Sequence, residues 1–276
     1  MLLTNACSLL TAVSNSQLYN NTKEISMEDF RAIFGVTVTV GGHVYLKLVN
    51  HHGSYCLKKL LMGLHFLKTY CNAATSAILF RVDRKTFSSS SWAAVKDIAS
   101  LELINFQARI TPQANHKVRM SVDGTDFRIR EPSPFSSIWY SHKFKGPGLR
   151  YEVGIGICSG GIVWVNGPFP CGSWPDLNIA RDGLVNFLEE GEKVIADGGY
   201  GGDSHFLTPT GVNDNFNNVM SVIRARHETV NGRLKSFNVL ATTFRHSLGN
   251  HSQCFMAVAN LVQVSLLTEA PLFDAF

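Results

Sequence analysis

The hydrophobic and polar positions of this chain follow two different periods, which change near residue 105. Upstream, apolar residues recur every three or four positions, as in amphipathic helices. Downstream, short apolar runs end in Gly, Asn or Asp, as strands do when they lead into turns. We therefore predict three parts: an unstructured tail over 1–25 that is rich in Asn, Ser and Thr, a helical region over 26–104, and a mixed α/β domain over 105–276.

The helical region contains several amphipathic segments. Leucines at helical spacing predict a helix over 57–70, and shorter helices are expected over 73–80 and 84–98. An earlier helix opens at Ser26, which is a plausible N-cap with Asp29 as its capping-box-like partner, and the run that follows Phe34 interrupts it.

A short turn separates the last two of these helices. Residues 81–83 form the turn, and Asp83 can cap the helix that follows. A tight turn between helices permits a helix-turn-helix, in which Arg84 and Lys85 would face DNA. The plainer alternative is a helical lobe in which Ser88–Ser91 is a poorly helical surface run.

The α/β domain alternates strand-like and helical segments in a recognisable order. Three strands, a helix, a fourth strand and a helix give the order of a ribonuclease H-like fold, here with one more apolar helix after it. The predicted strands cover 117–129, 150–158, 161–165 and 193–197, the predicted helices cover 176–190, 219–235 and 253–267, and a polar loop is expected over 213–218.

Composition adds a few exclusions. With 276 residues, 45% hydrophobic and 17% charged, the chain is expected to be a well-cored protein of one large or two small domains. The six scattered cysteines include no C-x-x-C pair, which predicts free thiols in a reducing compartment and argues against structural zinc. No stretch is long and apolar enough to span a membrane.

Three carboxylates are the main candidates for chemistry. Asp123 and Asp197 each end an apolar strand, and Glu228 lies on a basic helix. Three carboxylates at one point repel each other unless a divalent cation holds them, and oxygen-only ligation suits Mg²⁺ or Mn²⁺. Two such ions can drive phosphodiester cleavage. Taken singly, each has a plainer interpretation, since strand-end Asp-Gly is usually a turn and a helix glutamate can pair with i,i+4 neighbours on a solvated face.

Basic residues and one further acid complete the candidate set. Asp176 either caps the helix that follows it or serves as an auxiliary carboxylate. The helix that carries Glu228 would place Arg224 and Lys235 on phosphates. The net charge of +4 is compatible with a polyanion partner. The candidate DNA-binding residues are Lys143, Lys145, Arg224, Arg226, Arg233, Lys235, Arg84 and Lys85.

Four short motifs in order resemble the DDE superfamily endonuclease domain of PIF/Harbinger-type transposases and their domesticated relatives. The resemblance covers about residues 105–276, and two upstream segments are similar to the helix-turn-helix-like region of the same proteins. The motifs are VDGT over 122–125, GSWPD over 172–176, ADGGY over 196–200 and RARHE over 224–228, and the upstream segments are 60–70 and 85–87.

This resemblance implies a ribonuclease H-like core with Asp123, Asp197 and Glu228 as its metal-binding triad. It also implies strand cleavage and transfer at transposon ends, action in the nucleus, and a separate Myb-like DNA-binding partner.

We therefore predict a DNA endonuclease or transposase that acts as a homo-oligomer with two Mg²⁺ or Mn²⁺ ions. One ion would lie between Asp123 and Asp197, and the other between Asp123 and Glu228. The alternative is a domesticated, non-catalytic DNA-binding or protein-interaction factor. A metal phosphohydrolase of small molecules fits the basic helix less well.

Overall fold

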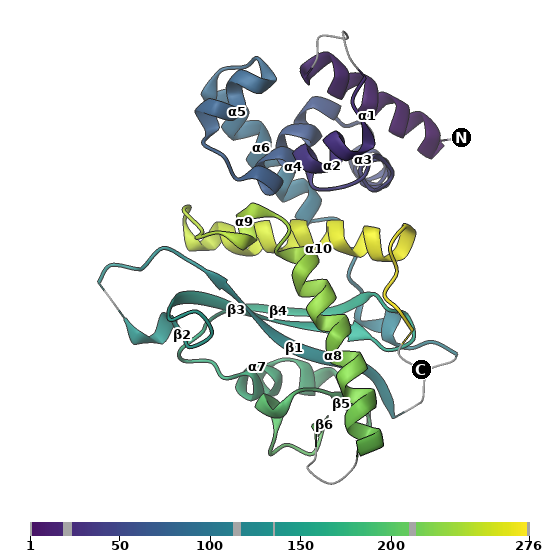
Figure 1. Ribbon diagram of the computed structural model, residues 1–276, viewed down its shortest axis with the longest axis vertical. Coiled ribbons are helices and arrows are strands. Elements are labelled where there is room, and N and C mark those ends of the chain that lie inside the picture. Colours follow the sequence, from purple (N-terminus) through teal and green to yellow (C-terminus); the bar gives the residue numbers. More distant parts are fainter. Residues whose placement is uncertain (1, 19–23, 113–116, 135, 210–213, 275–276) are drawn as a thin grey trace. The chain divides into compact units, whose positions relative to one another are not determined.

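The chain divides into a helical unit and a sheet unit. The computed structural model describes residues 2–18, 24–112, 117–134, 136–209 and 214–274 (Figure 1). The helical unit comprises Met1–Leu103, Leu234–Thr242 and Gly249–Glu269, and the sheet unit comprises Ile104–Arg233, Thr243–Leu248 and Ala270–Phe276. The chain passes from the helical unit to the sheet unit between Leu103 and Ile104, and two segments near the end of the chain group with the helical unit.

The helical unit contains the helices that leucine spacing predicts, together with several others. Its last helix joins this unit because it packs against α6 and α3 and is apolar on nearly every side. The helices are α1 (Leu2–Leu18), α2 (Met27–Phe34), α3 (Val38–His52), α4 (Leu57–Thr69), α5 (Ala73–Phe80), α6 (Arg84–Ala99), α9 (Asn238–Ala241) and α10 (His251–Thr268).

Two N-caps confirm the predicted helix starts. The Ser26 hydroxyl accepts a hydrogen bond from the Asp29 amide at 3.0 Å, and Asp83 accepts one from the Thr86 amide at 2.9 Å. Each bond satisfies a backbone donor that has no partner within the helix. The turn before α6 is also as short as expected, with Arg81 in the left-handed region at φ 51°.

Two expectations in this unit are wrong. The predicted unstructured tail is a helix over Leu2–Leu18, which packs against α3 and buries Leu10, while residues 1 and 19–23 of that tail lie outside the described residues. The run that follows Phe34 begins a new helix at Val38. Packing overrides intrinsic propensity in both segments, because Asn, Ser and β-branched residues are only weak helix formers.

The sheet unit has the ribonuclease H-like order. Its five main strands lie in the order β4-β3-β1-β5-β6, with antiparallel pairing among the first three and parallel pairing among the last three. Short β2 also pairs with β3. The strands are β1 (Val118–Arg128), β2 (Tyr140–Ser141), β3 (Gly146–Gly156), β4 (Ile162–Pro170), β5 (Lys193–Ile195) and β6 (Phe206–Leu207).

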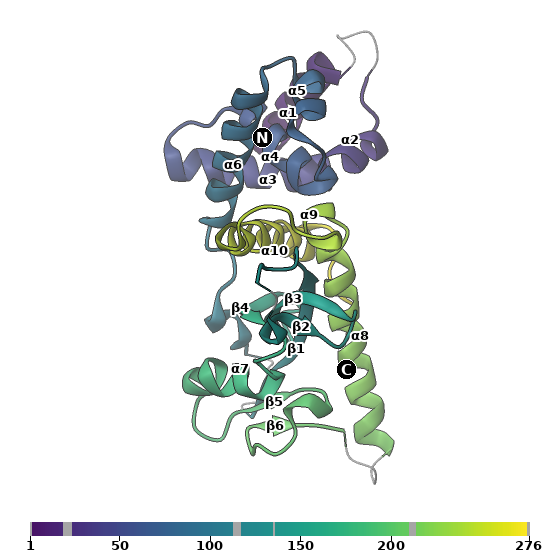
Figure 2. The same cartoon turned by 90° about the vertical axis from the view of Figure 1, so that its left-hand side faces the viewer.

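Two helices cover opposite faces of this sheet (Figure 2). On one face Met120 and Val122 pack with Ala180 of α7 (Asp176–Asp182), and on the other Ile195 packs with Ile223 of α8 (Asp214–Leu234). Ser121 of β1 lies beside His227 of α8, so alternate residues of β1 face different helices, as the two-residue period of a strand requires. Polar residues on β1 are divided between the same two faces.

Several predicted boundaries in the sheet unit need correction. The helix expected over 176–190 ends at Asp182, and a 3₁₀ turn over Leu184–Phe187 follows Gly183. The polar loop expected over 213–218 is helical from Asp214 onward, and residue 213 lies outside the described residues.

One test of membrane-spanning potential bears on the helical unit. Among the described residues no single helix is long and apolar enough to cross a membrane, whereas α2 and α3 meet the length and composition only as a pair bent by 57°.

Candidate active site

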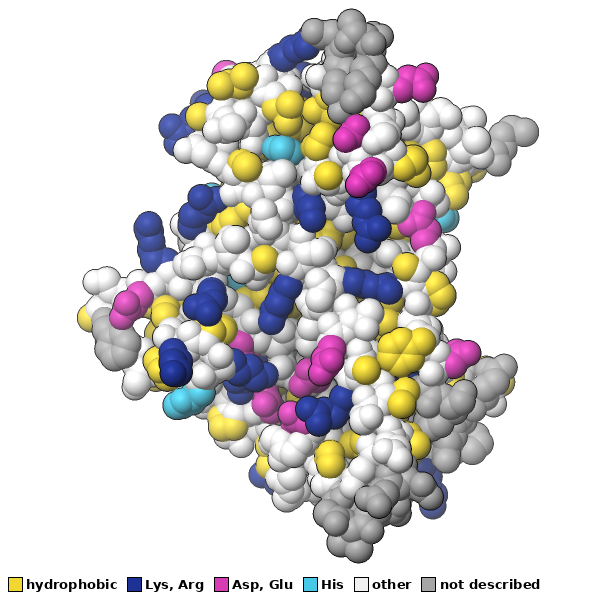
Figure 3. Space-filling view, in the orientation of Figure 1, with side chains coloured by type: hydrophobic (Ala, Val, Ile, Leu, Met, Phe, Trp, Pro, Cys, Tyr) yellow, Lys and Arg dark blue, Asp and Glu magenta, His cyan; other side chains and the backbone are white. Residues whose placement is uncertain are grey.

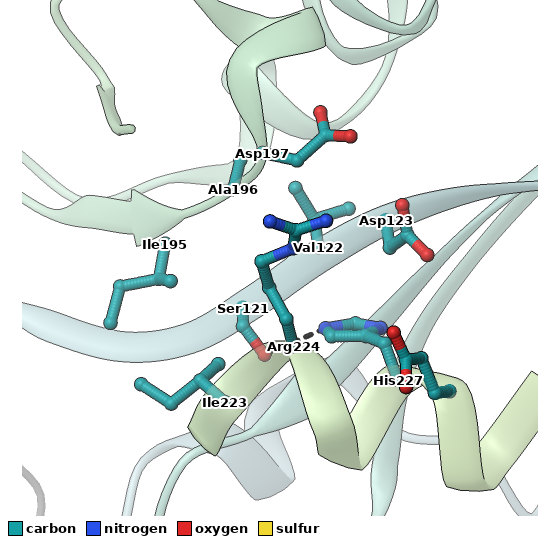
Figure 4. Close-up of a pocket in the computed structure, with 10 residues that line it drawn as sticks. Ser121, Val122, Asp123, Ile195, Ala196, Asp197, Ile223, Arg224 and His227 are labelled. Carbon is teal, nitrogen blue, oxygen red and sulfur yellow. Dashed lines mark hydrogen bonds between the residues drawn. The ribbon is translucent and has the colours of Figure 1, made fainter. Parts of the chain in front are cut away.

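The three predicted carboxylates line one pocket in the sheet unit (Figure 4). The pocket has a volume of about 60 Å³ and lies where β1, the end of β5 and α8 meet. Arg224 extends from α8 toward the two strands. The residues that line it are Ser121, Val122, Asp123, Ile195, Ala196, Asp197, Ile223, Arg224, His227 and Glu228.

Strand register explains why the two aspartates meet. Asp123 does not end a strand, as its Asp-Gly sequence suggested, because it lies in the middle of β1 and pairs with Val153. In the parallel pair of β1 and β5, Ser121 is opposite Ile195. Asp123 and Asp197 each follow that paired position by two residues, so they lie at the same level of the sheet.

Helix α8 brings Glu228 to the pocket through a buried contact of its neighbour. His227 lies beside Ser121 of β1, with 2.8 Å between His227 Nε2 and Ser121 Oγ. Burial, and to a lesser degree the charge of Arg226, lower the pKa of His227 to about 3, so the ring is neutral at physiological pH. Glu228 follows directly and is exposed at the pocket.

Asp176 lies beside the aspartate pair, at the start of α7. A Cβ placed on Gly124 would overlap Asp176 Oδ1, so the carboxylate fills the space that only a glycine leaves free. Asp176 Oδ1 is 3.3 Å from Arg150 Nη1 but is buried without a hydrogen bond. This position beside Gly124 favours the auxiliary interpretation over simple capping, and the role itself stays a prediction.

Electrostatic repulsion marks this group of acids. Burial raises the pKa of Asp123; Lys143 opposes the rise, and the charges of Asp197 and Asp176 add to it. Burial likewise raises the pKa of Asp176. The positive charges of Arg150 and Lys143 oppose this rise, and the negative charge of Asp197 adds to it. Lys143 is held near these acids because its Nζ donates to the Gly124 carbonyl at 2.8 Å.

A divalent cation would relieve this repulsion. The surrounding donors are carboxylate oxygens, which Mg²⁺ and Mn²⁺ prefer, and the buried Asp176 Oδ1 has unused acceptor capacity. Within the described ranges, no three His, Cys, Asp or Glu side chains already stand as a preformed metal cage. The donor chemistry therefore fits such an ion, which Asp123, Asp197 and Glu228 would hold.

The sequence did not reveal a second polar layer on the α7 face of the sheet. Asp126 is buried there and accepts from Arg150 Nε at 2.7 Å and from Ser141 Oγ at 2.6 Å. Two-residue alternation from Gly124 puts Asp126 on this inner face, which was the available signal. Its partners come from other strands and could not be identified locally.

Glu152 is a second buried acid on this face. It is only 1% exposed and accepts from Trp164 Nε1 at 2.7 Å. Burial raises the pKa of Glu152 to about 7, partly offset by its interactions with Trp164 and Tyr200. Tyr200 ends the 3₁₀ turn that Asp197 caps through its bond to Gly199 N, so this buried group supports the segment that carries Asp197.

The predicted DNA-binding residues have different environments. Arg226 is a correction, because it is 3% exposed and its Nη1 donates to the Ile157 carbonyl at 2.7 Å, which leaves it unavailable to DNA. Arg233 is half-buried and donates to the Ala270 carbonyl at 2.6 Å. Arg224, by contrast, is exposed and lines the pocket.

The remaining basic candidates are exposed. Lys145 follows Lys143 near the start of β3, and Lys235 comes directly after α8. Arg84 and Lys85 open α6 and line a shallow groove with Trp92. On one face of the sheet unit, acidic side chains lie among basic ones (Figure 3).

A family model described as "DDE superfamily endonuclease" matches residues 122–263, which are 142 of the chain's 276 residues. The chain therefore belongs to the DDE superfamily endonucleases. The match includes all three pocket carboxylates. No curated protein and no solved structure matches the chain.

Proposed function

We propose that this protein is a divalent-metal-dependent DNA endonuclease in which Asp123, Asp197 and Glu228 hold the metal. Membership of the DDE superfamily endonucleases indicates metal-dependent DNA cleavage. The single observation that carries the assignment of residues is that the three carboxylates, from β1, the end of β5 and α8, line one pocket. Each carboxylate alone would have a plainer structural explanation.

The chemistry divides between the ion and the chain. Mg²⁺ or Mn²⁺ supplies Lewis-acid stabilisation of the phosphate and lowers the pKa of bound water. Asp123 is central and would serve both ions of a two-ion site, with Asp197 and Glu228 each serving one. Arg224 lines the same pocket and can donate two parallel hydrogen bonds to phosphate oxygens.

DNA is the substrate that the family implies, and we extend this to a set of contacts. In the sheet unit, Lys143, Lys145 and Arg224 are the basic side chains that would contact the DNA backbone. In the helical unit, Arg84 and Lys85 at the start of α6 would contact DNA if α5 and α6 act as a helix-turn-helix.

The more specific biology follows from the resemblance to PIF/Harbinger-type proteins. We propose strand cleavage and transfer at transposon ends in the nucleus, by a homo-oligomer working with a Myb-like DNA-binding partner. The order of the four motifs supports this proposal.

Nicking of supercoiled plasmid by the purified full chain tests the assignment. With Mg²⁺ or Mn²⁺, the wild type should nick, and Asp123→Asn, Asp197→Asn and Glu228→Gln should not. Asp182→Asn removes an exposed acid from the end of α7 and should nick normally. Nicking by the Asp197→Asn protein would overturn the triad, and a folded wild type that binds DNA without cutting it would favour the non-catalytic factor.

A further inference from the structure

Asn231 of α8 contacts the first aspartate of the pocket directly. Its Nδ2 donates a hydrogen bond to Asp123 Oδ2 at 3.3 Å. Asn231 lies three residues beyond Glu228, so both side chains project from the same side of the helix. Bonds at catalytic groups are often long before the ligand binds and tighten in its presence.

The surrounding contacts hold this part of α8 against the sheet. His227 and Ser121 form a buried pair at 2.8 Å, and Arg226 donates to the Ile157 carbonyl at 2.7 Å. Both contacts lie within about 1.5 turns of Asn231 along the helix. These two contacts fix the position of the α8 backbone relative to β1. The Asn231 amide therefore starts from a fixed point beside Asp123.

The chemistry of an amide suits this position. Asp123 is repelled by Asp197 and Asp176, so its carboxylate has an electrostatic reason to turn away from them. A neutral amide donor can fix one carboxylate oxygen and leave the other free. Unlike lysine or arginine, it brings no positive charge that would compete with a cation for the acid.

We propose that Asn231 is a positioning residue, which holds Asp123 Oδ2 and thereby orients the carboxylate toward the metal. This inference rests on the proposed function, because it assumes that Asp123 is a metal ligand. Partners of this kind around metal-bound carboxylates typically change metal affinity or activity by about 10–100-fold when they are removed.

The test follows two quantities while Mn²⁺ is titrated: plasmid nicking by the full chain, and the rise in its unfolding temperature without DNA, which reports Mn²⁺ binding independently of activity. Asn231→Leu keeps the size of the side chain and removes the donor, and Asn231→Gln keeps an amide on a longer arm. We expect Asn231→Leu to raise the half-saturating Mn²⁺ concentration about 10–100-fold without weakening plasmid binding. Asn231→Gln should recover part of that loss.

Asn231→Asp adds one more negative charge beside Asp123, and Asn218→Asp is its matched control. Asn218 is exposed on the same helix, 13 residues earlier, so its substitution adds the same charge far from Asp123. We expect a changed Mn²⁺ dependence only for Asn231→Asp. Thermal unfolding without metal identifies any variant that does not fold, and Asn231→Ala replaces Asn231→Leu in that case.

The outcomes separate this inference from the proposed function. If Asp123→Asn nicks like the wild type, the proposed function fails whatever Asn231 does. If Asp123→Asn is inactive while Asn231→Leu, or Asn231→Ala in its place, keeps the wild-type Mn²⁺ curve, only the positioning role is overturned. A shifted curve with partial recovery by Asn231→Gln supports it.

Discussion

The helical unit and the sheet unit bury polar residues of different kinds. Among the described residues, the buried polar side chains of the helical unit are Ser, Asn, Gln and His, which are neutral at physiological pH. The sheet unit instead buries ionisable groups of both signs, namely Arg109, Arg119, Asp126, Glu152, Glu192 and Arg226. Because a buried charge is costly unless it is paired, the sheet unit has to supply partners that the helical unit does not need.

The charges of the sheet unit fall into two groups. Arg109 and Glu192 form a bidentate pair at 2.9 and 3.0 Å, away from the pocket, and this pair serves the fold. Asp123, Asp176 and Asp197 instead repel one another at the pocket. Arg150 and Lys143 offset only part of this repulsion, and a group of acids that still costs stability is typical of a functional site.

The largest expected effect is on the repelling group. Asp123→Asn should reduce nicking by about a thousand-fold or more, because metal catalysis supplies several kcal/mol and each 1.4 kcal/mol is a factor of ten. The same variant should unfold at a higher temperature than the wild type in EDTA. The pKa of Asp123 is raised in the fold, so its ionised form lowers stability at every pH above the ordinary value. A lower unfolding temperature in EDTA would contradict the repulsion.

The paired group should respond in the opposite way. Arg109→Ala removes the bidentate partner of buried Glu192, which keeps Arg119 at 3.7 Å and the Glu189 amide at 3.0 Å, and should lower the free energy of unfolding by about 3 kcal/mol. Leu64→Ala in the helical unit removes a fully buried side chain and should cost about 2–5 kcal/mol through a cavity. Denaturant unfolding of the full chain measures both. Replacing Arg109 by Met and Glu192 by Leu in one protein should recover much of the stability lost in Arg109→Ala, because no buried charge is then left without its bidentate partner.

Divalent metal should act on the sheet unit through the pocket. Mn²⁺ at about 100 times its Kd should stabilise the wild type by about 2.7 kcal/mol, because it binds the folded state selectively. The increase should be absent in Asp123→Asn. If Mn²⁺ does not change the unfolding of the wild type, the pocket does not bind this ion. Differential scanning fluorimetry with EDTA as the reference measures this shift.

Acid should reveal the smallest difference, with opposite signs for the buried histidines of the helical unit and for the raised-pKa acids beside the pocket. Burial lowers the pKa values of His65 and His251 in the helical unit to about 4. Their stabilising contribution is therefore present above the ordinary pKa of about 6.5 and is lost as the pH falls toward 4, by up to about 1.4 kcal/mol per pH unit for each histidine. His65→Gln should flatten this dependence in acid unfolding curves, and an unchanged slope would contradict it. Protonation of Asp123 and Asp176 has the opposite sign, because their pKa values are raised in the fold, and it offsets part of the stability that the sheet unit loses in acid at His227 and Asp126.

Local sequence patterns predicted much of the fold. The leucine spacing of α4 and the cap of α6 are read over a few neighbouring residues, and so is the succession of strands and helices along the chain. Helix α1 was missed because its Asn and Ser content is a poor helix signal and its stability comes from packing on α3. Helix α10 was placed with the sheet because only tertiary contacts show that it packs in the helical unit.

The site was predictable as a set of carboxylates, but its supports were not. The Asp-Gly motifs of Asp123 and Asp197 drew attention to the two aspartates. The pairing of Asp126 with Arg150 depends on a strand register that no local pattern encodes. The same limit explains Arg226, since a basic residue on a helix gives no sign of whether it faces solvent or a buried carbonyl.

The way the chain leaves the helical unit and returns to it has a consequence for biosynthesis. Asn260 of α10 donates from Nδ2 to the carbonyls of Ile98 and Ala99, at 2.9 and 3.2 Å, near the end of α6. At synthesis rates of roughly 5–20 residues per second, α6 waits about ten seconds or more for this partner to be made. During that interval the apolar face of α6 that α10 later covers is exposed on the nascent chain, so the helical unit can complete its core only after α10 has been synthesised.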